Sequence, residues 1–325
     1  MTAIPKDEGR RSGGGFAYVR NALGGGGWLL LPTIALLAAA VWMPKLPVTR
    51  DAYDHMVIFD VSQSMNVEDY RIGDRVVSRL AFAKHAVAEA LKNPKCDTRI
   101  GWAVFAGRKI VTLLAPVEVC RNYSALLEAL DNIDSRMAFE RSSEIQEGLL
   151  WTMTNIRDLK PLPTVIFMTD GHEAPPLPPE RIRSYDGALG EVRGWVIGVG
   201  GTEPQPIPKS DQDGRRIGFW RATEVLQWGG AANITGGTSH EHLSELREAH
   251  LQQLAKNVGF GYARLADAKS LDSALHDRAL AHPATVETDL RWIPGLLALL
   301  LLGCWFRPDH RKAPVAGVSR QRSTS

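Results

Sequence analysis

Two short polar runs contain oxygen ligands at spacings suited to a metal site. The first is Asp60-Val61-Ser62-Gln63-Ser64, and the second is Thr169-Asp170-Gly171. Hydroxyl and carboxylate oxygens are hard ligands that favour Mg²⁺, Mn²⁺ or Ca²⁺, and no Cys/His cluster in the sequence competes for zinc. Either run taken alone also fits a helix N-cap or a turn. The two runs predict one divalent-metal site if the fold brings them together.

Each run follows an apolar segment with the pattern of a buried strand, Tyr53–Asp60 for the first and Thr164–Met168 for the second. Further strand patterns and helical patterns alternate with these two. The additional strands are expected at Arg99–Phe105, Lys109–Leu114, Trp195–Val199 and Tyr262–Leu265, and the helices at Ser78–Leu91, Tyr123–Ile133, Ser143–Ile156 and Glu241–Val258. This alternation predicts an α/β, doubly wound, mostly parallel sheet, with one antiparallel edge strand supplied by the hairpin around Ala106-Gly107-Arg108. Ligands of such sheets bind beyond the carboxyl ends of the strands.

The Asp-x-Ser-x-Ser run resembles the metal-ion-dependent adhesion site (MIDAS) of von Willebrand factor A (VWA) domains, and Thr-Asp-Gly resembles the distal aspartate loop of that site. The resemblance implies a third ligand loop with Thr or Ser at the start of a helix. Ser142-Ser143-Glu144-Ile145 falls at the matching place, although the family often has Thr preceded by Gly. The implied cofactor is Mg²⁺, with Mn²⁺ or Ca²⁺ as alternatives. The implied metal ligands are Asp60, Ser62, Ser64, Ser143 and Asp170.

The resemblance covers most of Tyr53–Leu275 and is closest to the bacterial membrane-anchored VWA proteins of the Bat (aerotolerance) and methanol-oxidation (Mxa) types. The stretches that carry it are Asp60–Tyr70, Ser78–Leu80, Ile197–Gly201, Pro204–Pro208 and Asp213-Gly214. The Gly- and Pro-rich stretch Gly201–Thr238 reads as a loop or hairpin. In the family a partner's Glu or Asp fills the open metal position. The resemblance also implies work beside a MoxR-type AAA+ ATPase system, in assembly of a periplasmic complex such as a Ca²⁺-dependent quinoprotein methanol dehydrogenase.

Two apolar runs, Trp28–Met43 and Trp292–Phe306, interrupt an otherwise ordinary composition. Both predict transmembrane helices with tryptophans at their ends. A cleaved signal peptide is the alternative for the first run, because Ala38–Ala40 could form a cleavage site. Basic residues before the first run and after the second place both tails in the cytoplasm. The expected organisation is a cytoplasmic tail at 1–27, a transmembrane helix at 28–44, a periplasmic VWA domain at 51–285, a second transmembrane helix at 292–306 and a cytoplasmic tail at 307–325.

Several function classes are disfavoured. The chain has a formal net charge of only +2, and its acidic and basic residues are mixed, which argues against nucleic-acid binding. No nucleophile–base pairing is evident, and we expect no enzyme activity. His172 and Glu173 lie beside the site, where neighbouring loop residues more often shape a rim than act as a general-base pair. A metal-dependent hydrolase and a purely structural subunit of a membrane complex are the alternatives.

Two of the three cysteines flank the expected hairpin. Cys96 precedes its first strand and Cys120 follows its second, so both lie at the same end of the ribbon. Disulfides persist in proteins exported from the cytoplasm. The placement predicts a Cys96–Cys120 bond, against the alternative of two small buried side chains with free thiols.

Overall fold

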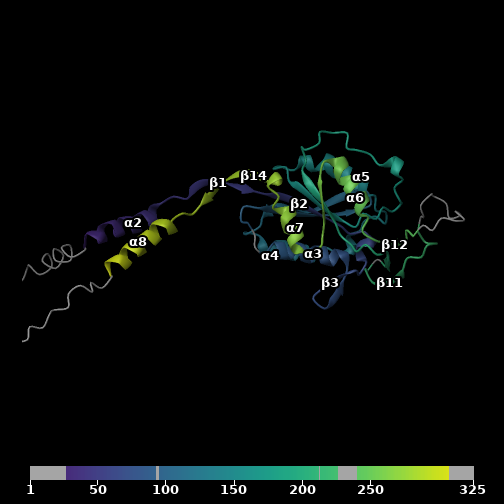
Figure 1. The fold of residues 1–325 in the computed structure, drawn as a ribbon, viewed down its shortest axis with the longest axis horizontal. Coiled ribbons are helices and arrows are strands. Elements are labelled where there is room, and N and C mark those ends of the chain that lie inside the picture. Colours follow the sequence, from purple (N-terminus) through teal and green to yellow (C-terminus); the bar gives the residue numbers. More distant parts are fainter. Residues whose placement is uncertain (1–26, 93–94, 212, 226–239, 307–325) are drawn as a thin grey trace, which may run out of the picture. The chain divides into compact units, whose positions relative to one another are not determined.

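The computed structural model describes residues 27–92, 95–211, 213–225 and 240–306 (Figure 1). The chain divides into two compact units, one formed by Arg50–Ala284 and the other by Met1–Thr49 with Thr285–Ser325. The expected cytoplasmic tails and residues 226–239 of the Gly- and Pro-rich stretch lie outside the described residues, apart from Gly27.

The first unit is built on a six-stranded sheet that contains both ligand runs. Its strand order is β13-β8-β7-β2-β5-β6. All neighbouring strands are parallel except β5 and β6, which form the antiparallel edge hairpin. The expected α/β fold with a mostly parallel sheet is therefore confirmed. The strands, in sheet order, are Gly261–Arg264, Gly194–Gly198, Thr164–Thr169, Asp54–Asp60, Arg99–Ala106 and Lys109–Glu118.

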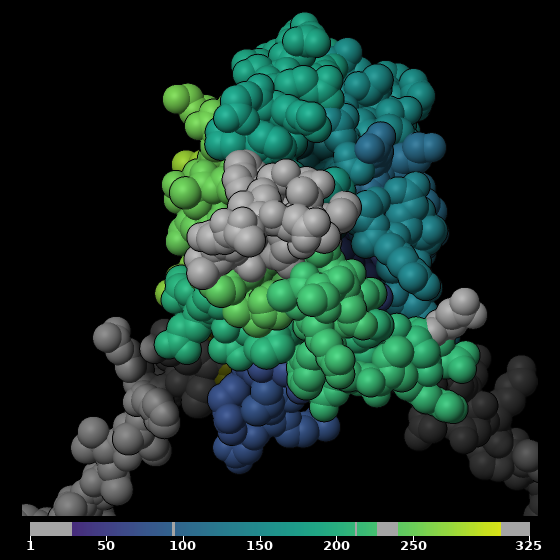
Figure 2. Space-filling view, turned by 90° about the vertical axis from the view of Figure 1, so that its right-hand side faces the viewer, coloured from purple at the N-terminus to yellow at the C-terminus, as the bar shows by residue number. Residues whose placement is uncertain are grey.

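The stretch after β8 is an insertion that precedes helix α6 (Glu248–Val258). Strand β9 (Gln205–Pro206) pairs with β12 (Leu243–Ser244), and β10 (Pro208–Ser210) forms an antiparallel hairpin with β11 (Arg216–Phe219). Helix α6 begins later than the expected Glu241, because the preceding residues pair with β9. Figure 2 shows the insertion, in green, as a lobe near the blue hairpin of β3 (Tyr70–Ile72) and β4 (Arg75–Val77).

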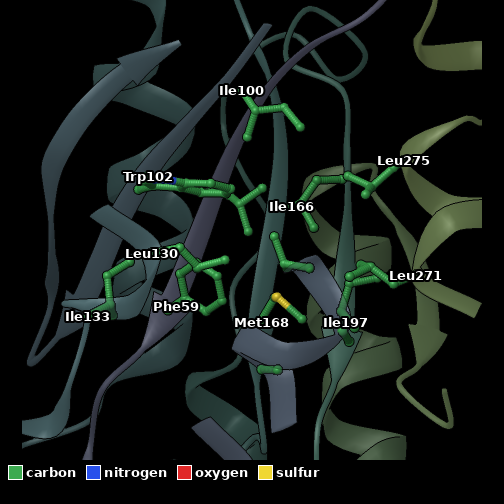
Figure 3. Packing of buried hydrophobic residues seen from close by; sticks show 14 of the residues in the cluster. Phe59, Ile100, Trp102, Leu130, Ile133, Ile166, Met168, Ile197, Leu271 and Leu275 are labelled. Atoms are coloured by element: carbon green, nitrogen blue, oxygen red, sulfur yellow. The ribbon is translucent and has the colours of Figure 1, made fainter. Parts of the chain in front are cut away.

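Helices cover both faces of the sheet, because alternate residues of each buried strand point to opposite sides. Phe59 joins Trp102 and Ile166 in one apolar cluster, whereas its neighbour Ile58 joins Phe105 in the other (Figure 3 shows the first cluster). The first cluster is closed by α3 (Arg79–Ala90), α4 (Tyr123–Asp131) and α7 (Ala268–Leu275), and the second by α5 (Ile145–Asn155) and α6. Short 3-10 helices lie at Gly27–Leu29, Gln63–Asn66, Ser135–Met137, Ile156–Asp158, Pro179–Arg181 and Arg278–Leu280.

The edge hairpin carries a disulfide. The structure joins Cys96 and Cys120, the pair that the sequence indicates, with their Cα atoms 5.3 Å apart. Glu118 accepts hydrogen bonds from the backbone N–H groups of Asp97 and Cys120, which orders the same end of the hairpin. The bond therefore ties the edge of the sheet at the end away from the turn at Gly107.

The second unit contains two apolar helices that contact each other, α2 (Leu30–Trp42) and α8 (Trp292–Trp305). They fall in the segments where the sequence predicts transmembrane spans, 28–44 and 292–306. Among the described residues, no helix combines the length and the apolar character needed to cross a membrane. Strand β1 (Leu46–Ala52), which follows α2, pairs with β14 (His282–Thr288), which precedes α8.

Candidate metal centre

Parallel pairing of β2 with β7 brings the two predicted ligand runs together. Phe59 is in register with Met168, so Asp60 ends one strand beside Thr169 and Asp170 at the end of the next. Both aspartates have 0% exposure. Two buried carboxylates at one edge of a sheet are costly unless cations or hydrogen bonds compensate them.

Hydrogen bonds fix the orientation of Asp60. One of its carboxylate oxygens accepts the Ser62 N–H at 2.9 Å, and the other accepts the Thr169 hydroxyl at 2.6 Å. Burial, reinforced by the charge of Asp170, nevertheless raises the pKa of Asp60 to about 7. A nearby divalent cation would favour the ionised form, so this raised pKa fits a carboxylate placed for metal binding.

The two serines of the first run lie with their hydroxyls together. The Ser62 and Ser64 Oγ atoms are 3.1 Å apart, and both residues are buried. They lie at the start of the 3-10 helix that follows β2, which turns both side chains towards the same cavity. Two hydroxyl oxygens at this separation can serve as adjacent ligands of one cation.

Ser143 enters the site from a loop held on two sides. Its backbone exchanges two hydrogen bonds of 2.8 Å with Ala174, which follows the second ligand run. The neighbouring Glu144 N–H donates to Gly107 O at the turn of the edge hairpin. Ser143 is 2% exposed, yet its Oγ has no hydrogen-bond partner among the described residues. A buried hydroxyl without a partner is costly, and a metal ligand position explains it.

Arg79 is a buried residue of the site to which the sequence interpretation assigned no role. Its guanidinium donates to Asp170 Oδ2 at 2.6 Å and makes two contacts with Asp69 Oδ2 at 2.9 and 2.7 Å. Ser244 accepts from it through both Oγ and its backbone oxygen. Burial opposes ionisation of Asp170, but the charge of Arg79 outweighs it, so the pKa of Asp170 lies below its usual range. In the sequence Arg79 begins a helix that also contains Lys84, His85 and Glu89, so no local signal set it apart.

Glu173 has a structural task at the start of α5. Its two carboxylate oxygens accept the Ile145 and Gln146 N–H groups at the start of α5, at 2.9 and 3.1 Å. His250 Nε2 lies 3.2 Å from the same carboxylate. Glu173 thus satisfies the first turn of the helix that follows the Ser143 loop. The loop position of Ser143 depends on this buried contact.

A cavity of about 450 Å³ opens in front of these residues. Its floor includes the three serines of the predicted ligand set, Ser62, Ser64 and Ser143. Most of the remaining lining comes from the loop after β7 and from the insertion, including His172, Pro175, Pro176, Ile207 and Trp220. The five predicted ligands therefore converge from three loops, with the hydroxyls facing the cavity and the carboxylates behind them. The donor set fits a hard divalent cation.

Comparisons with known proteins agree with this fold. Residues 55–172 match the family model of the von Willebrand factor type A domain. A crystal structure of an aerotolerance-related membrane protein from Bacteroides fragilis aligns at 20% identity and TM-score 0.48, covering 70% of this chain and 98% of that one. The protein BatB from Bacteroides thetaiotaomicron gives the same values.

A third structure is proximal thread matrix protein 1 from the mussel byssus with a zinc-occupied MIDAS motif. It aligns at 15% identity and TM-score 0.34, covering 71% of this chain and 48% of that one. At these values the likenesses assign neither activity nor partner to this chain. The comparison with curated proteins gives no match.

Proposed function

Since residues 55–172 match the family model of the von Willebrand factor type A domain, we propose that the unit formed by Arg50–Ala284 binds a divalent cation, Mg²⁺ or Mn²⁺, which in turn binds a carboxylate of a partner protein. The observation that carries the proposal is the unpartnered Ser143 hydroxyl, buried in the same cavity as Ser62 and Ser64. These serines are neutral ligands, so the cation keeps most of its positive charge towards the open side of the cavity.

The charges behind the serines support the same conclusion. Asp60 and Asp170 bring two negative charges, and Arg79 offsets one of them through its 2.6 Å contact with Asp170. Arg79 also pairs with Asp69 at 2.7 Å, so the three carboxylates (−3) and the guanidinium (+1) leave a charge of −2 that a bound divalent cation balances. Because the ligands that line the cavity are neutral serine hydroxyls, the open side of the cation favours an anionic ligand, and a Glu or Asp side chain supplies one.

We propose a binding role without catalysis. Among the described residues that line the cavity, Glu173 is engaged at the start of α5 and Glu224 pairs with Lys209 at 2.8 Å. Glu241, the third glutamate of the lining, pairs with Arg247 at 3.1 Å, so each of the three has a partner, which disfavours each as a general base. A metal-dependent hydrolase would need such a base.

Attachment to the inner membrane is part of the proposal. Large apolar side chains project from α2 and α8 into the surroundings, with Leu31 at 66% exposure and Leu299 at 65%. Surfaces of this kind favour a lipid environment. We propose that the domain lies in the periplasm and both tails in the cytoplasm, and the Cys96–Cys120 bond, which fits an oxidising compartment, supports this. In that setting the domain would serve as an assembly or maturation factor, in the manner of the MoxR-associated VWA proteins.

The metal site is tested by titrating Mg²⁺ and Mn²⁺ into the purified chain by calorimetry. Ser143→Ala should weaken binding, whereas the matched control Ser142→Ala should not, because the Ser142 hydroxyl contacts Glu140 instead. Equal affinities in the two variants would refute the ligand assignment. Topology is tested separately: a reporter active only outside the cytoplasm should work when fused after residue 200 and fail at the C-terminus. The reverse pattern would overturn the localisation.

A further inference from the structure

The insertion after β8 reaches the metal loop through one aromatic residue. The Trp220 indole N–H donates to the side-chain oxygen of Gln63, which stands between the two serine ligands. The Trp220 backbone N–H donates to Ile207 O at 3.0 Å, and Lys209 Nζ lies 4.4 Å from the centre of the indole ring. Contacts with Gln63, Ile207 and Lys209 thus fix the position of Trp220 next to the first ligand run.

Apolar surface surrounds the site within the cavity. Trp220 and Ile207 come from the insertion, and Pro175 and Pro176 come from the loop after the second ligand run. The serine ligands are 7% exposed or less, so they are recessed below this surface. A flat protein face cannot reach a recessed cation, whereas a side chain on a narrow extended segment can.

The cavity is also lined by a histidine with one ring nitrogen that has no hydrogen-bond partner among the described residues. His172 is 4% exposed and lines the cavity, and its Nδ1 has no hydrogen-bond partner among the described residues. A neutral imidazole can donate one hydrogen bond and accept another. A carboxylate bound to the cation through one oxygen has a second oxygen that can accept from such a donor.

The acidic residues of the lining do not repel such a ligand, because each is engaged elsewhere. Glu173 holds the start of α5, Glu224 pairs with Lys209, and Glu241 pairs with Arg247 at 3.1 Å. Exposed Arg141 adds a positive charge to the lining. The bound cation is then the charge that most strongly attracts or repels a ligand entering the cavity.

We propose that this cavity recognises an acidic side chain on an extended segment of a partner protein whose neighbouring residues are apolar, with Trp220 contacting the apolar neighbour and His172 the carboxylate. The proposal rests on the metal-binding function above and adds the chemistry of the ligand. A volume near 450 Å³ accommodates one acidic side chain together with part of one neighbour. The cation then selects for the acidic side chain, and Trp220 and Ile207 of the insertion select for the apolar neighbour.

The test uses the full chain with Mg²⁺ and three blocked pentapeptides: glutamate flanked by leucines, glutamate flanked by glycines, and glutamine flanked by leucines. The leucine-flanked glutamate peptide should bind about tenfold more tightly than the glycine-flanked one, as expected for one additional buried apolar contact. The glutamine peptide should not bind. Trp220→Ala should remove the advantage of leucine, and Trp220→Phe should keep most of it.

His172→Phe keeps a planar aromatic ring but removes its hydrogen bonding, so it should weaken the binding of both glutamate peptides and leave the ratio of their affinities unchanged. The Mg²⁺ affinity measured without peptide should be the same in all three variants, which separates a failure of recognition from a failure of metal binding. Equal affinities of the two glutamate peptides for the wild-type chain, or binding of free glutarate as tight as that of the leucine-flanked peptide, would overturn the proposal. Absence of any peptide binding by the Mg²⁺-loaded chain would overturn it as well.

Discussion

Replacing Ser143 by alanine should separate metal binding from folding. The Ser143 hydroxyl is buried without a hydrogen-bond partner, so its removal breaks no contact within the described residues. The metal-free variant should be at least as stable as the wild type, because the substitution removes a buried hydroxyl that has no partner among the described residues. The same variant loses one predicted ligand, so its metal affinity should fall.

The size of the effect follows from linkage. At a free metal concentration of about 100 times the dissociation constant, binding stabilises the native state by about 2.7 kcal/mol. A tenfold weaker variant at the same concentration gains only about 1.4 kcal/mol. For a domain as large as residues 50–284, the difference of about 1.3 kcal/mol lowers the metal-induced rise in Tm by roughly 3 to 5 °C.

The assay is thermal unfolding followed by circular dichroism, with and without Mg²⁺. Ser142→Ala is the matched control and should keep the full metal-induced shift. A Ser143→Ala variant with an undiminished shift would show that the hydroxyl is not a ligand. A large loss of stability in the absence of metal would show instead that the hydroxyl has a structural partner, contrary to the geometry described above.

Three further predictions concern buried charges and the disulfide. Asp170→Ala should abolish metal binding and also destabilise the metal-free domain by about 3 to 5 kcal/mol in urea unfolding, because it breaks the buried pair with Arg79; an unchanged unfolding midpoint would contradict the pairing. The pKa of Asp60 is raised to about 7, so its favourable contribution to metal-free stability is present below its unfolded value near 4 and is lost as the pH rises to 7. Mg²⁺ should therefore stabilise the domain more at pH 8 than at pH 5, and a flat dependence would refute this. Reducing the Cys96–Cys120 bond should cost on the order of 3 kcal/mol while leaving Mg²⁺ affinity unchanged, which calorimetry on the reduced chain checks.

The strands and helices were predictable because local apolar patterns determine them. The run that ends at Asp60 and the run that ends at Thr169 each have the continuous hydrophobic character of a strand buried on both faces, and the structure buries every residue of both. Helix α3 likewise begins after Ser78, whose hydroxyl accepts the Ala81 N–H. Where long-range pairing competes, the local pattern misleads. The residues just after Glu241 pair with β9, which delays α6 until Glu248.

Asp60, Ser62, Ser64 and Asp170 could be proposed from the sequence because their residue types and their positions after strands are local properties, whereas Ser143 was implied by the resemblance to VWA domains. The partners of Arg79 could not, since it contacts Asp170 across 91 positions and Ser244 across 165. The absence of a partner for Ser143 and the placement of Trp220 beside Gln63 likewise depend on residues distant in the chain. The sequence by itself determined the elements and the chemical nature of the site. The tertiary structure decided which charges are compensated, that the Ser143 hydroxyl has no partner among the described residues, and that Trp220 lines the cavity. These properties follow from contacts between distant segments, which no local periodicity encodes.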